Sequence, residues 1–368
     1  MAGSIRKDGN TWYYILEIGN VNGKRKQKKK RGFKTKKDAQ KALIEAEHTL
    51  LKDGMFYEPS NMLYEDFITQ WLNDKKTTLK NSTLNTYKWL ITNYIIPNLG
   101  NIELSKLSPI IVQQFYNSLI NERIISRQNV QKIHSIINNS LDKALKWNLV
   151  NKNVAKLVDR PKAFKRELIV WNEEEVKIFL EVAIKSRYYI AYLLALSTGM
   201  RQGEILALKW ANLELKNKSL SVTHTLSHDG KEILPGAKTR SSLRSIYLPD
   251  KTINALEEHR ANINSEKQYA DILYKDNDLI VCTNIGTPCN PRNLLRSFYS
   301  LIEKSKVPKI RFHDLRHTHA TLLLKQGVNP KIVAERLGHS NIHITLDLYS
   351  HVIPSMQQES ANKLNNIL

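Results

Sequence analysis

The first 55 residues combine a strand pattern, a run of basic residues and a helical pattern. Residues 11–18 are rich in aromatic and β-branched side chains, which are typical of a β-strand. Asn22-Gly23 stands at a hairpin-turn position, and residues 24–33 are predicted to return as a second strand. A helix follows, whose apolar residues share one face: Ala39, Ala42, Leu43, Ala46 and Leu50. We therefore predict a small sheet plus one helix over residues 1–55.

Apolar residues then recur at helical spacing. Four helices are predicted, over residues 62–72, 84–94, 110–119 and 126–147. Ser108 is a good N-cap residue, and Pro109 after it is favoured in the first turn of a helix. Pro161 interrupts the pattern within a basic connector. This spacing predicts an all-helical domain over residues 56–160.

The remainder, residues 161–368, mixes helical patterns with a few strand patterns. Residues 188–196 are continuously apolar and predict a buried helix that ends at Gly199. Residues 219–223 and 245–248 are predicted strands on either side of a polar stretch. We therefore predict a multidomain chain, mainly α with small β-sheets, whose third domain is mixed α+β.

The chain carries a large positive charge, which is concentrated near its amino terminus. Among its 368 residues, 56 Lys and Arg against 35 Asp and Glu give a net charge of +21. The first 41 residues hold 13 basic and 3 acidic residues. Such an excess indicates a polyanionic partner, either nucleic acid or an anionic membrane.

The basic run has two interpretations. It could be a disordered basic arm, since charge runs often are. The flanking strand and helix patterns favour a folded module, and a two-stranded ribbon fits the major groove of DNA. The predicted DNA-binding residues are Lys24, Arg25, Lys26, Lys28, Lys29, Lys30, Arg31 and Lys34.

A membrane or secreted protein is not indicated. The longest apolar run, residues 188–196, falls short of the roughly 20 residues that a spanning helix needs. The first residues contain charges without an apolar stretch, unlike a secretory signal. Two cysteines suggest neither a disulfide framework nor a structural zinc site. We expect a cytoplasmic protein without a metal.

The candidate catalytic residues are cationic rather than acidic. Neither a phosphate-binding P-loop nor a G-x-G-x-x-G loop is present, which argues against a nucleotide-driven machine. Arg201 follows the buried helix and precedes Glu204, which could be its structural partner. His313 and Arg316, at i and i+3 on a helix, can both reach one phosphate group. A zinc site built from His313 and His317 is disfavoured because the cation of Arg316 would oppose the metal.

Tyr349 completes this set, together with His339 ten residues before it. A phenol has a pKa near 10 and is a poor nucleophile at neutral pH. It becomes useful where guanidinium and imidazole groups stabilise the charge that builds on a phosphorane. Arginine suits this task because its planar fork grips phosphate oxygens and stays protonated.

The order of these motifs resembles the tyrosine recombinases, specifically the phage-type integrases. The matching motifs are Arg201, His313-x-x-Arg316, Leu337-Gly338-His339-Ser340 and Tyr349. The resemblance implies that Tyr349 attacks the scissile phosphate to form a 3′-phosphotyrosyl link. It also implies that Arg201, Arg316 and His339 hold the non-bridging oxygens and that His313 assists proton transfer. Lys238 occupies the place of the family's general-acid lysine, and Glu204 would orient Arg201.

The resemblance extends to architecture and partners. It implies that residues 1–55 are an arm-type DNA-binding domain, residues 56–160 a core-binding domain and residues 161–368 the catalytic domain. Double-stranded DNA with attachment core and arm sites would be bound by a homotetramer, without metal, ATP or other cofactor. An excision factor and a host DNA-bending protein are further implied partners.

Two other functions use some of the same features. A non-catalytic DNA-binding regulator on the same fold would share the basic amino terminus but would not need Tyr349 with its Arg and His residues. A metal-dependent nuclease or transposase would lose its activity in EDTA. The leading prediction is a site-specific recombinase that integrates and excises a mobile element.

Overall fold

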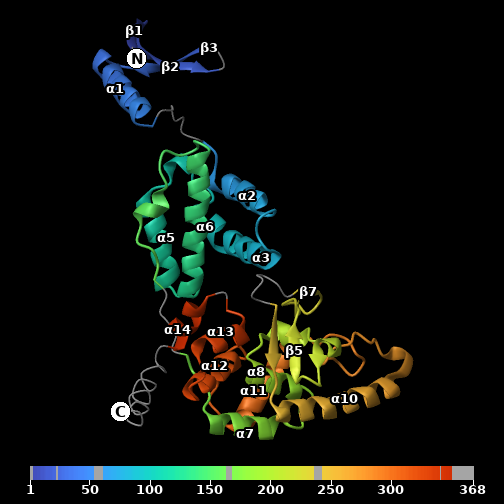
Figure 1. Ribbon diagram of the computed structural model, residues 1–368. Helices are drawn as coiled ribbons and strands as arrows, with labels where there is room; N and C mark the ends of the chain where they lie inside the picture. Colours follow the sequence, from blue (N-terminus) through green and yellow to red (C-terminus); the bar gives the residue numbers. More distant parts are fainter. Residues whose placement is uncertain are drawn as a thin grey trace, which may run out of the picture. The chain divides into compact units, whose positions relative to one another are not determined.

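The computed structural model describes residues 3–21, 24–53, 61–162, 168–235, 243–339 and 341–349 (Figure 1). The chain divides into two units, residues 1–165 and residues 166–368. The predicted domain boundaries at residues 55 and 160 remain predictions, and the first of them lies outside the described residues.

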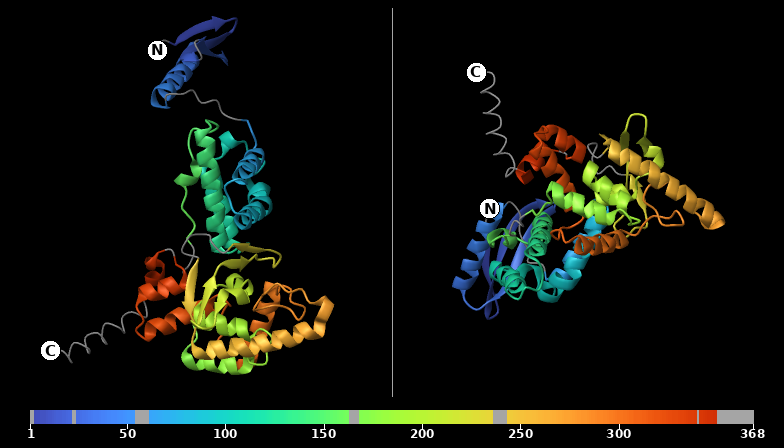
Figure 2. Two further views of the ribbon diagram at one scale, coloured as in Figure 1. Left: turned by 45° about the vertical axis from the view of Figure 1, so that its right-hand side comes forward. Right: turned by 90° about the horizontal axis from the view of Figure 1, so that it is seen from below.

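The basic amino-terminal segment forms an antiparallel sheet with strand order β1-β2-β3. Its elements are β1 (Ser4–Asp8), β2 (Thr11–Val21), β3 (Lys24–Phe33) and α1 (Lys36–Asp53). Helix α1 lies against one face of the sheet, where Tyr14 and Leu16 of β2 pack on Leu43 and Ala46 (Figure 2). The sequence did not predict β1, because its five residues contain a single apolar side chain and pair only with the edge of β2. The predicted turn residues Asn22 and Gly23 lie outside the described part.

The second segment is helical, as predicted. Its α-helices are α2 (Tyr64–Lys75), α3 (Asn81–Leu90), α4 (Ile96–Leu99), α5 (Pro109–Asn121) and α6 (Arg127–Lys146). A π-helical turn, η1 (Ile91–Ile95), joins α3 to α4, and two short 3-10 helices are η2 (Leu104–Lys106) and η3 (Val154–Leu157). Ser108 caps α5 by accepting a hydrogen bond from the amide of Ile111. A buried hydrogen bond of 2.9 Å between the hydroxyls of Tyr64 and Ser140 links α2 to α6.

The carboxy-terminal unit combines helices with two small sheets. Its α-helices are α7 (Glu173–Ala183), α8 (Tyr189–Thr198), α9 (Gln202–Leu206), α10 (Asp250–Ala270), α11 (Pro291–Ser305), α12 (Asp314–Lys325), α13 (Pro330–Leu337) and α14 (Ile342–Tyr349). One sheet has the order β4-β5-β8, with β4 (Leu213–Glu214), β5 (Ser219–Val222) and β8 (Arg244–Tyr247). The other pairs β6 (His224–Leu226) with β7 (Ile233–Pro235). Two 3-10 turns are η4 (Trp210–Asn212) and η6 (Asp271–Leu273).

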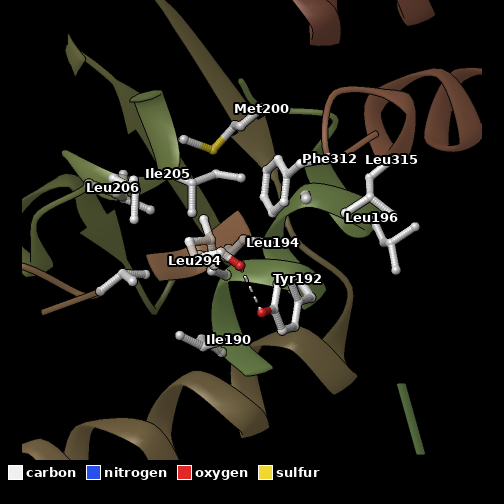
Figure 3. Packing of buried hydrophobic residues seen from close by; sticks show 14 of the residues in the cluster. Ile190, Tyr192, Leu194, Leu196, Met200, Ile205, Leu206, Leu294, Phe312 and Leu315 are labelled. Atoms are coloured by element: carbon white, nitrogen blue, oxygen red, sulfur yellow. Dashed lines mark hydrogen bonds between the residues drawn. The ribbon is translucent and has the colours of Figure 1, made fainter. Parts of the chain in front are cut away.

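Helix α8 is the centre of this unit's hydrophobic core. Its apolar residues pack among α7, α10 and α12, and Figure 3 shows Tyr192 beside Leu294 of α11. The Tyr192 hydroxyl donates to the Leu294 carbonyl at 3.4 Å, which satisfies a buried polar group. The predicted fold class, mainly helical with small antiparallel sheets, is confirmed. The sequence missed β6 and β7, because these three-residue strands pair only with each other in a largely polar stretch.

Helix α8 ends at Gly199, as the sequence predicted. Gly199 has φ +67°, a left-handed conformation that glycine adopts without steric cost. A Cβ atom here would lie 2.6 Å from the Leu337 side chain and 2.7 Å from that of His319. The chain therefore turns sharply between two packed side chains, and this turn places Arg201 at the start of α9.

Candidate active site

Arg201 stands at the N-cap of α9 and is held by the carboxylate of Glu204. Its backbone amide donates to Glu204 Oε2 at 2.9 Å, and its Nη1 donates to Oε1 at 2.7 Å. The Glu204 side chain is 4% exposed, whereas that of Arg201 is 42% exposed. One end of the guanidinium is thus fixed while much of the group remains accessible.

A second arginine, Arg244 at the start of β8, binds the same carboxylate. Its Nη2 and Nη1 atoms lie 2.8 and 3.3 Å from Glu204 Oε2 and Oε1. Burial alone would raise the pKa of Glu204, but hydrogen bonds and charge from Arg244, with smaller effects from Arg201, lower it below its ordinary value. Glu204 is therefore a charged carboxylate shared by two guanidinium groups.

Arg316 lies on α12 and is almost fully buried. Its Nη1 donates to the Gly199 carbonyl at 2.7 Å, and its Nη2 donates to the Leu337 carbonyl at 2.6 Å. These carbonyls end α8 and α13, and a cation is favoured at the carboxyl end of a helix. Arg316 thereby joins the turn that precedes Arg201 to the turn that carries His339.

Three histidines surround these arginines. His313 precedes α12 at its N-cap, and its ring lies 5.2 Å from that of His317 at nearly a right angle. Desolvation, reinforced by the charges of Arg316 and Arg201, lowers the pKa of His313 and brings that of His339 to about 4. Desolvation and the neighbouring His313 bring the pKa of His317 to about 4 as well. These imidazoles are therefore neutral near pH 7.

His339 connects the site to the last described helix. It follows Gly338, whose φ of +67° ends α13, and its Nδ1 lies 2.8 Å from the Thr345 hydroxyl of α14. Helices α13 and α14 also pack against each other. Tyr349 is the final residue of α14, and its side chain lies outside the described part of the structure.

The structure thus brings four predicted residues together: Arg201, His313, Arg316 and His339. Glu204 binds Arg201 directly, as expected of an orienting partner. Lys238 falls within residues 236–242, outside the described residues. In the ranges that the structure does describe, no group of three His, Cys, Asp or Glu side chains is placed to hold a metal ion. Within the same ranges, no helix has the length and apolar character needed to cross a membrane.

Arg244 and Thr345 are contacts that sequence reasoning missed. In β8 the side chain of Arg244 is buried, Ser245 is exposed, Ile246 is buried and Tyr247 is exposed. An arginine on the inward face of a predicted strand needs a buried partner, because an unpaired buried charge is costly. The available sequence signal was the position of Arg244 two residues before the apolar Ile246, on the same face of the strand, and it did not identify Glu204 as the partner.

The basic residues of β3 lie close to aromatic rings. Lys29 Nζ is 3.9 Å from the centre of the Tyr13 ring, and Arg31 is 5.9 Å from the same ring. Lys30 lies 6.0 Å from the ring of Phe33. In the register, Lys28 and Lys30 pair with Leu16 and Tyr14, which face α1, whereas Lys29 pairs with Ile15. The basic side chains therefore alternate between the two faces of the sheet.

The other predicted DNA-binding residues are less completely described. Lys34 is exposed beyond the end of β3. Lys24, Arg25 and Lys26 belong to β3 by their backbone, but their side chains lie outside the described part.

Comparison with known proteins assigns a family to each region. The phage integrase family model matches residues 170–356, an arm DNA-binding domain model matches residues 4–50, and an N-terminal SAM-like domain model of phage integrases matches residues 63–120.

Relatives match over most of the chain. A XerC-like tyrosine recombinase of Caldanaerobacter subterraneus subsp. tengcongensis is 30% identical over 98% of this chain and 97% of its own. The ICEBs1 integrase of Bacillus subtilis is 26% identical over 76% of this chain and 77% of its own. The Tn1549 transposon integrase in complex with circular intermediate DNA shares the fold, with a TM-score of 0.71, 19% identity and coverage of 82% and 99%. The chain belongs to the phage integrase family of tyrosine recombinases.

Proposed function

We propose that this site-specific DNA recombinase integrates and excises a mobile element by forming a 3′-phosphotyrosyl bond through Tyr349. The observation that carries the proposal is the gathering of Arg201, Arg316, His313 and His339 on the turns at the ends of α8, α12 and α13. Through the His339–Thr345 contact, this cationic site is joined to α14, the helix that ends at Tyr349.

In the proposed cleavage step, the Tyr349 hydroxyl gives up its proton, for which the neutral imidazole of His313 is the proposed acceptor, and its oxygen bonds to the scissile phosphorus. The bond from phosphorus to the 5′-oxygen breaks. The leaving 5′-oxygen takes a proton, for which Lys238 is the proposed donor. The accessible part of the Arg201 guanidinium can bind a non-bridging oxygen, with Arg316 supplying positive charge beneath it.

The histidines contribute hydrogen bonds without adding charge. In the tautomer proposed here, the Thr345 hydroxyl donates to Nδ1 of His339, so that Nε2 carries the ring proton and can donate it to a phosphate oxygen. His313 is exposed enough to assist proton transfer to or from DNA. Strand rejoining reverses these steps, and the phosphotyrosine conserves the bond energy. The proposed reaction therefore needs neither a metal nor ATP.

The three sequence regions are assigned separate DNA contacts in this proposal. Residues 1–55 would bind arm sites through β3, while residues 56–160 and 161–368 would bind the core of the attachment site. Matches to the arm-binding and SAM-like models support this division. We further propose that the active form is a homotetramer on DNA in the cytoplasm. An excision factor and a host DNA-bending protein would control its direction.

The test uses duplex DNA from the flanks of the protein's own gene, nicked near candidate crossover points so that cleavage is trapped. Wild type, Tyr349→Phe and Tyr269→Phe are incubated with it in EDTA and separated on a denaturing gel. Tyr269 is 94% exposed in α10 and serves as the matched control. We expect a covalent band with wild type and Tyr269→Phe, and none with Tyr349→Phe.

Two results would contradict the proposal. Cleavage by Tyr349→Phe would exclude Tyr349 as the nucleophile. Tight binding without an adduct from wild type, on DNA shown to contain the crossover site, would favour a DNA-binding regulator.

A further inference from the structure

We infer that Arg244 is a positioning residue for DNA cleavage, because it connects the two chain segments that carry Arg201 and His339. The inference rests on the proposed function, which assigns those two residues to the cleavage site. Arg244 itself would act through its neighbours, without touching the DNA.

The first connection is made by hydrogen bonds to the segment that carries Arg201. Arg244 spans both oxygens of Glu204, and the other contacts of this carboxylate go to the amide and guanidinium of Arg201. The side chains of Arg244 and Glu204 are only 6% and 4% exposed. A planar guanidinium that holds both oxygens fixes the rotation of the carboxylate. The orientation of Arg201 therefore depends on Arg244.

The second connection is made by hydrogen bonds to the segment that carries His339. Nε of Arg244 donates to the Arg336 carbonyl at 2.7 Å, in the last turn of α13. The side chain of Arg336 donates to the carbonyls of Tyr247 and Ser197, at 3.2 and 3.1 Å. Both ends of β8 are thus hydrogen-bonded to Arg336 of α13. Gly338 and His339 follow directly after this last turn of α13.

Arg244 is therefore the residue at which the turn that carries Arg201 and the end of α13 meet.

Removal of Arg244 should leave a distinctive pH signature. The charged groups that act on Glu204 are Arg244 from β8 and Arg201 from its own turn. Three other elements pack on α9. Helix α8 carries no Asp, Glu, Lys, Arg or His, and His224 of β6 contacts Thr223. The hydrogen bond between α9 and α11 joins Gln202 to the Pro291 carbonyl. Without Arg244, burial would raise the pKa of Glu204 against Arg201 alone. Glu204 would then take up a proton at higher pH and release Arg201.

The experiment measures single-turnover cleavage of the nicked substrate between pH 5 and 8. Arg244→Met should cleave roughly 10²-fold more slowly than wild type, comparable to the loss of one oxyanion donor. The acid limb of its pH profile should move to higher pH, because the pKa of Glu204 rises when Arg244 is removed. DNA binding should change by less than about threefold, since Arg244 makes no DNA contact in this proposal.

Two further variants isolate the cause. Arg244→Lys keeps the charge but cannot hold both Glu204 oxygens and the Arg336 carbonyl. It should therefore cleave slowly while its acid limb stays near that of wild type. Adding Glu204→Gln to Arg244→Met should remove the shift of the acid limb, because the titrating carboxylate is gone.

Arg187→Met is the control for removing an arginine that binds both oxygens of a carboxylate and a backbone carbonyl, here with both side chains about one third exposed. Arg187 binds both oxygens of Glu266, at 2.6 and 2.7 Å, and donates Nε to the Cys282 carbonyl at 3.1 Å. This geometry mirrors that of Arg244 in another part of the unit. Arg187→Met should lower the melting temperature and leave the cleavage rate and pH profile unchanged.

The outcomes separate this inference from the proposed function. Wild-type cleavage rates in both Arg244 variants would overturn it, as would equal losses of rate in Arg244→Met and Arg187→Met. If Arg244→Met does not fold, Arg244→Lys provides the test. A cleavage rate at least tenfold below that of wild type, at an unchanged melting temperature, supports the inference. A wild-type cleavage rate overturns it. Absence of a Tyr349-dependent adduct in wild type would instead defeat the proposed function.

Discussion

The cationic groups of the catalytic unit and those of the amino-terminal sheet are held in opposite ways. Arg316 is 3% exposed and donates to two carbonyls at helix ends, whereas the side chain of Arg31 is 63% exposed, 3.6 Å from Asp8. Buried charges keep fixed positions in a medium of low dielectric, where their effect on a reacting group is large. Exposed lysines and arginines can follow a DNA backbone but are screened by salt. The first arrangement suits catalysis, and the second suits binding.

The two regions also differ in what supports them. The amino-terminal sheet rests on a small core that includes Tyr14, Leu16 and Leu43. The catalytic unit packs a far larger core around α8, including Trp171 and Phe298. A small core buries little apolar surface and therefore gives only marginal stability. The comparison predicts that substitutions in the catalytic network act on rate and stability, whereas those in the arm act on salt-dependent affinity.

The largest effect is expected for Arg316→Met. This change removes a buried positive charge from the proposed phosphate-binding site and leaves the buried carbonyls of Gly199 and Leu337 without these donors. Single-turnover cleavage should fall by at least ~10³-fold. Each orphaned carbonyl should cost about 1–3 kcal/mol of the free energy of unfolding. Rapid-quench cleavage and thermal melts measure the two effects, and a variant that melts and cleaves like wild type would contradict this role.

The next effect is a loss of stability in acid. Burial holds the pKa of His317 and of His319 at about 4, below the ordinary value near 6.5. Between these values the unfolded chain binds more protons than the folded one, so stability falls as pH falls from about 6.5 toward 4. Each histidine should contribute at most about 1.4 kcal/mol per pH unit. Denaturant titrations at several pH values test this, and a flat profile in that window would be inconsistent with neutral buried histidines.

The smallest effect on catalysis is expected in the arm. Replacing Lys29 and Arg31 by Gln should lower the log–log salt slope of arm-site binding by about 0.9 for each DNA phosphate that is no longer neutralised. Cleavage of a core-site substrate should not change. Fluorescence anisotropy at several salt concentrations measures the slope, with Lys185→Gln and Lys304→Gln together as the exposed control pair. An unchanged slope would indicate that this face of the sheet does not bind DNA.

The sequence predicted those features whose signal is local. Gly199 after an apolar run predicted the end of α8, and the spacing of His313 and Arg316 predicted their common site. The pair formed by Glu204 and Arg244 is separated by 40 residues and exists only because β8 folds back toward α9. The spacing of apolar residues along the chain does not indicate that Glu204 and Arg244 would meet.

Other features depended on tertiary partners in the same way. Strand β1 forms because β2 offers an unpaired edge, not because residues 4–8 favour a strand. The contact between His339 and Thr345 joins the end of α13 to α14. The sequence does not specify how these two helices are placed relative to each other. The residues proposed to carry the chemistry could thus be named from local motifs, whereas the residues that hold them in place became visible only in the fold.

The most direct measurement of the central claim is the chemical identity of the residue that bonds to DNA. Trapped wild-type adduct would be digested with nuclease and trypsin and mapped by mass spectrometry. Cleavage after Arg336 and Lys363 gives a peptide in which Tyr349 is the only tyrosine. We predict a nucleotide linked through phosphate to Tyr349. A nucleotide on any other residue, or a non-covalent complex alone at the verified crossover site, would contradict the account.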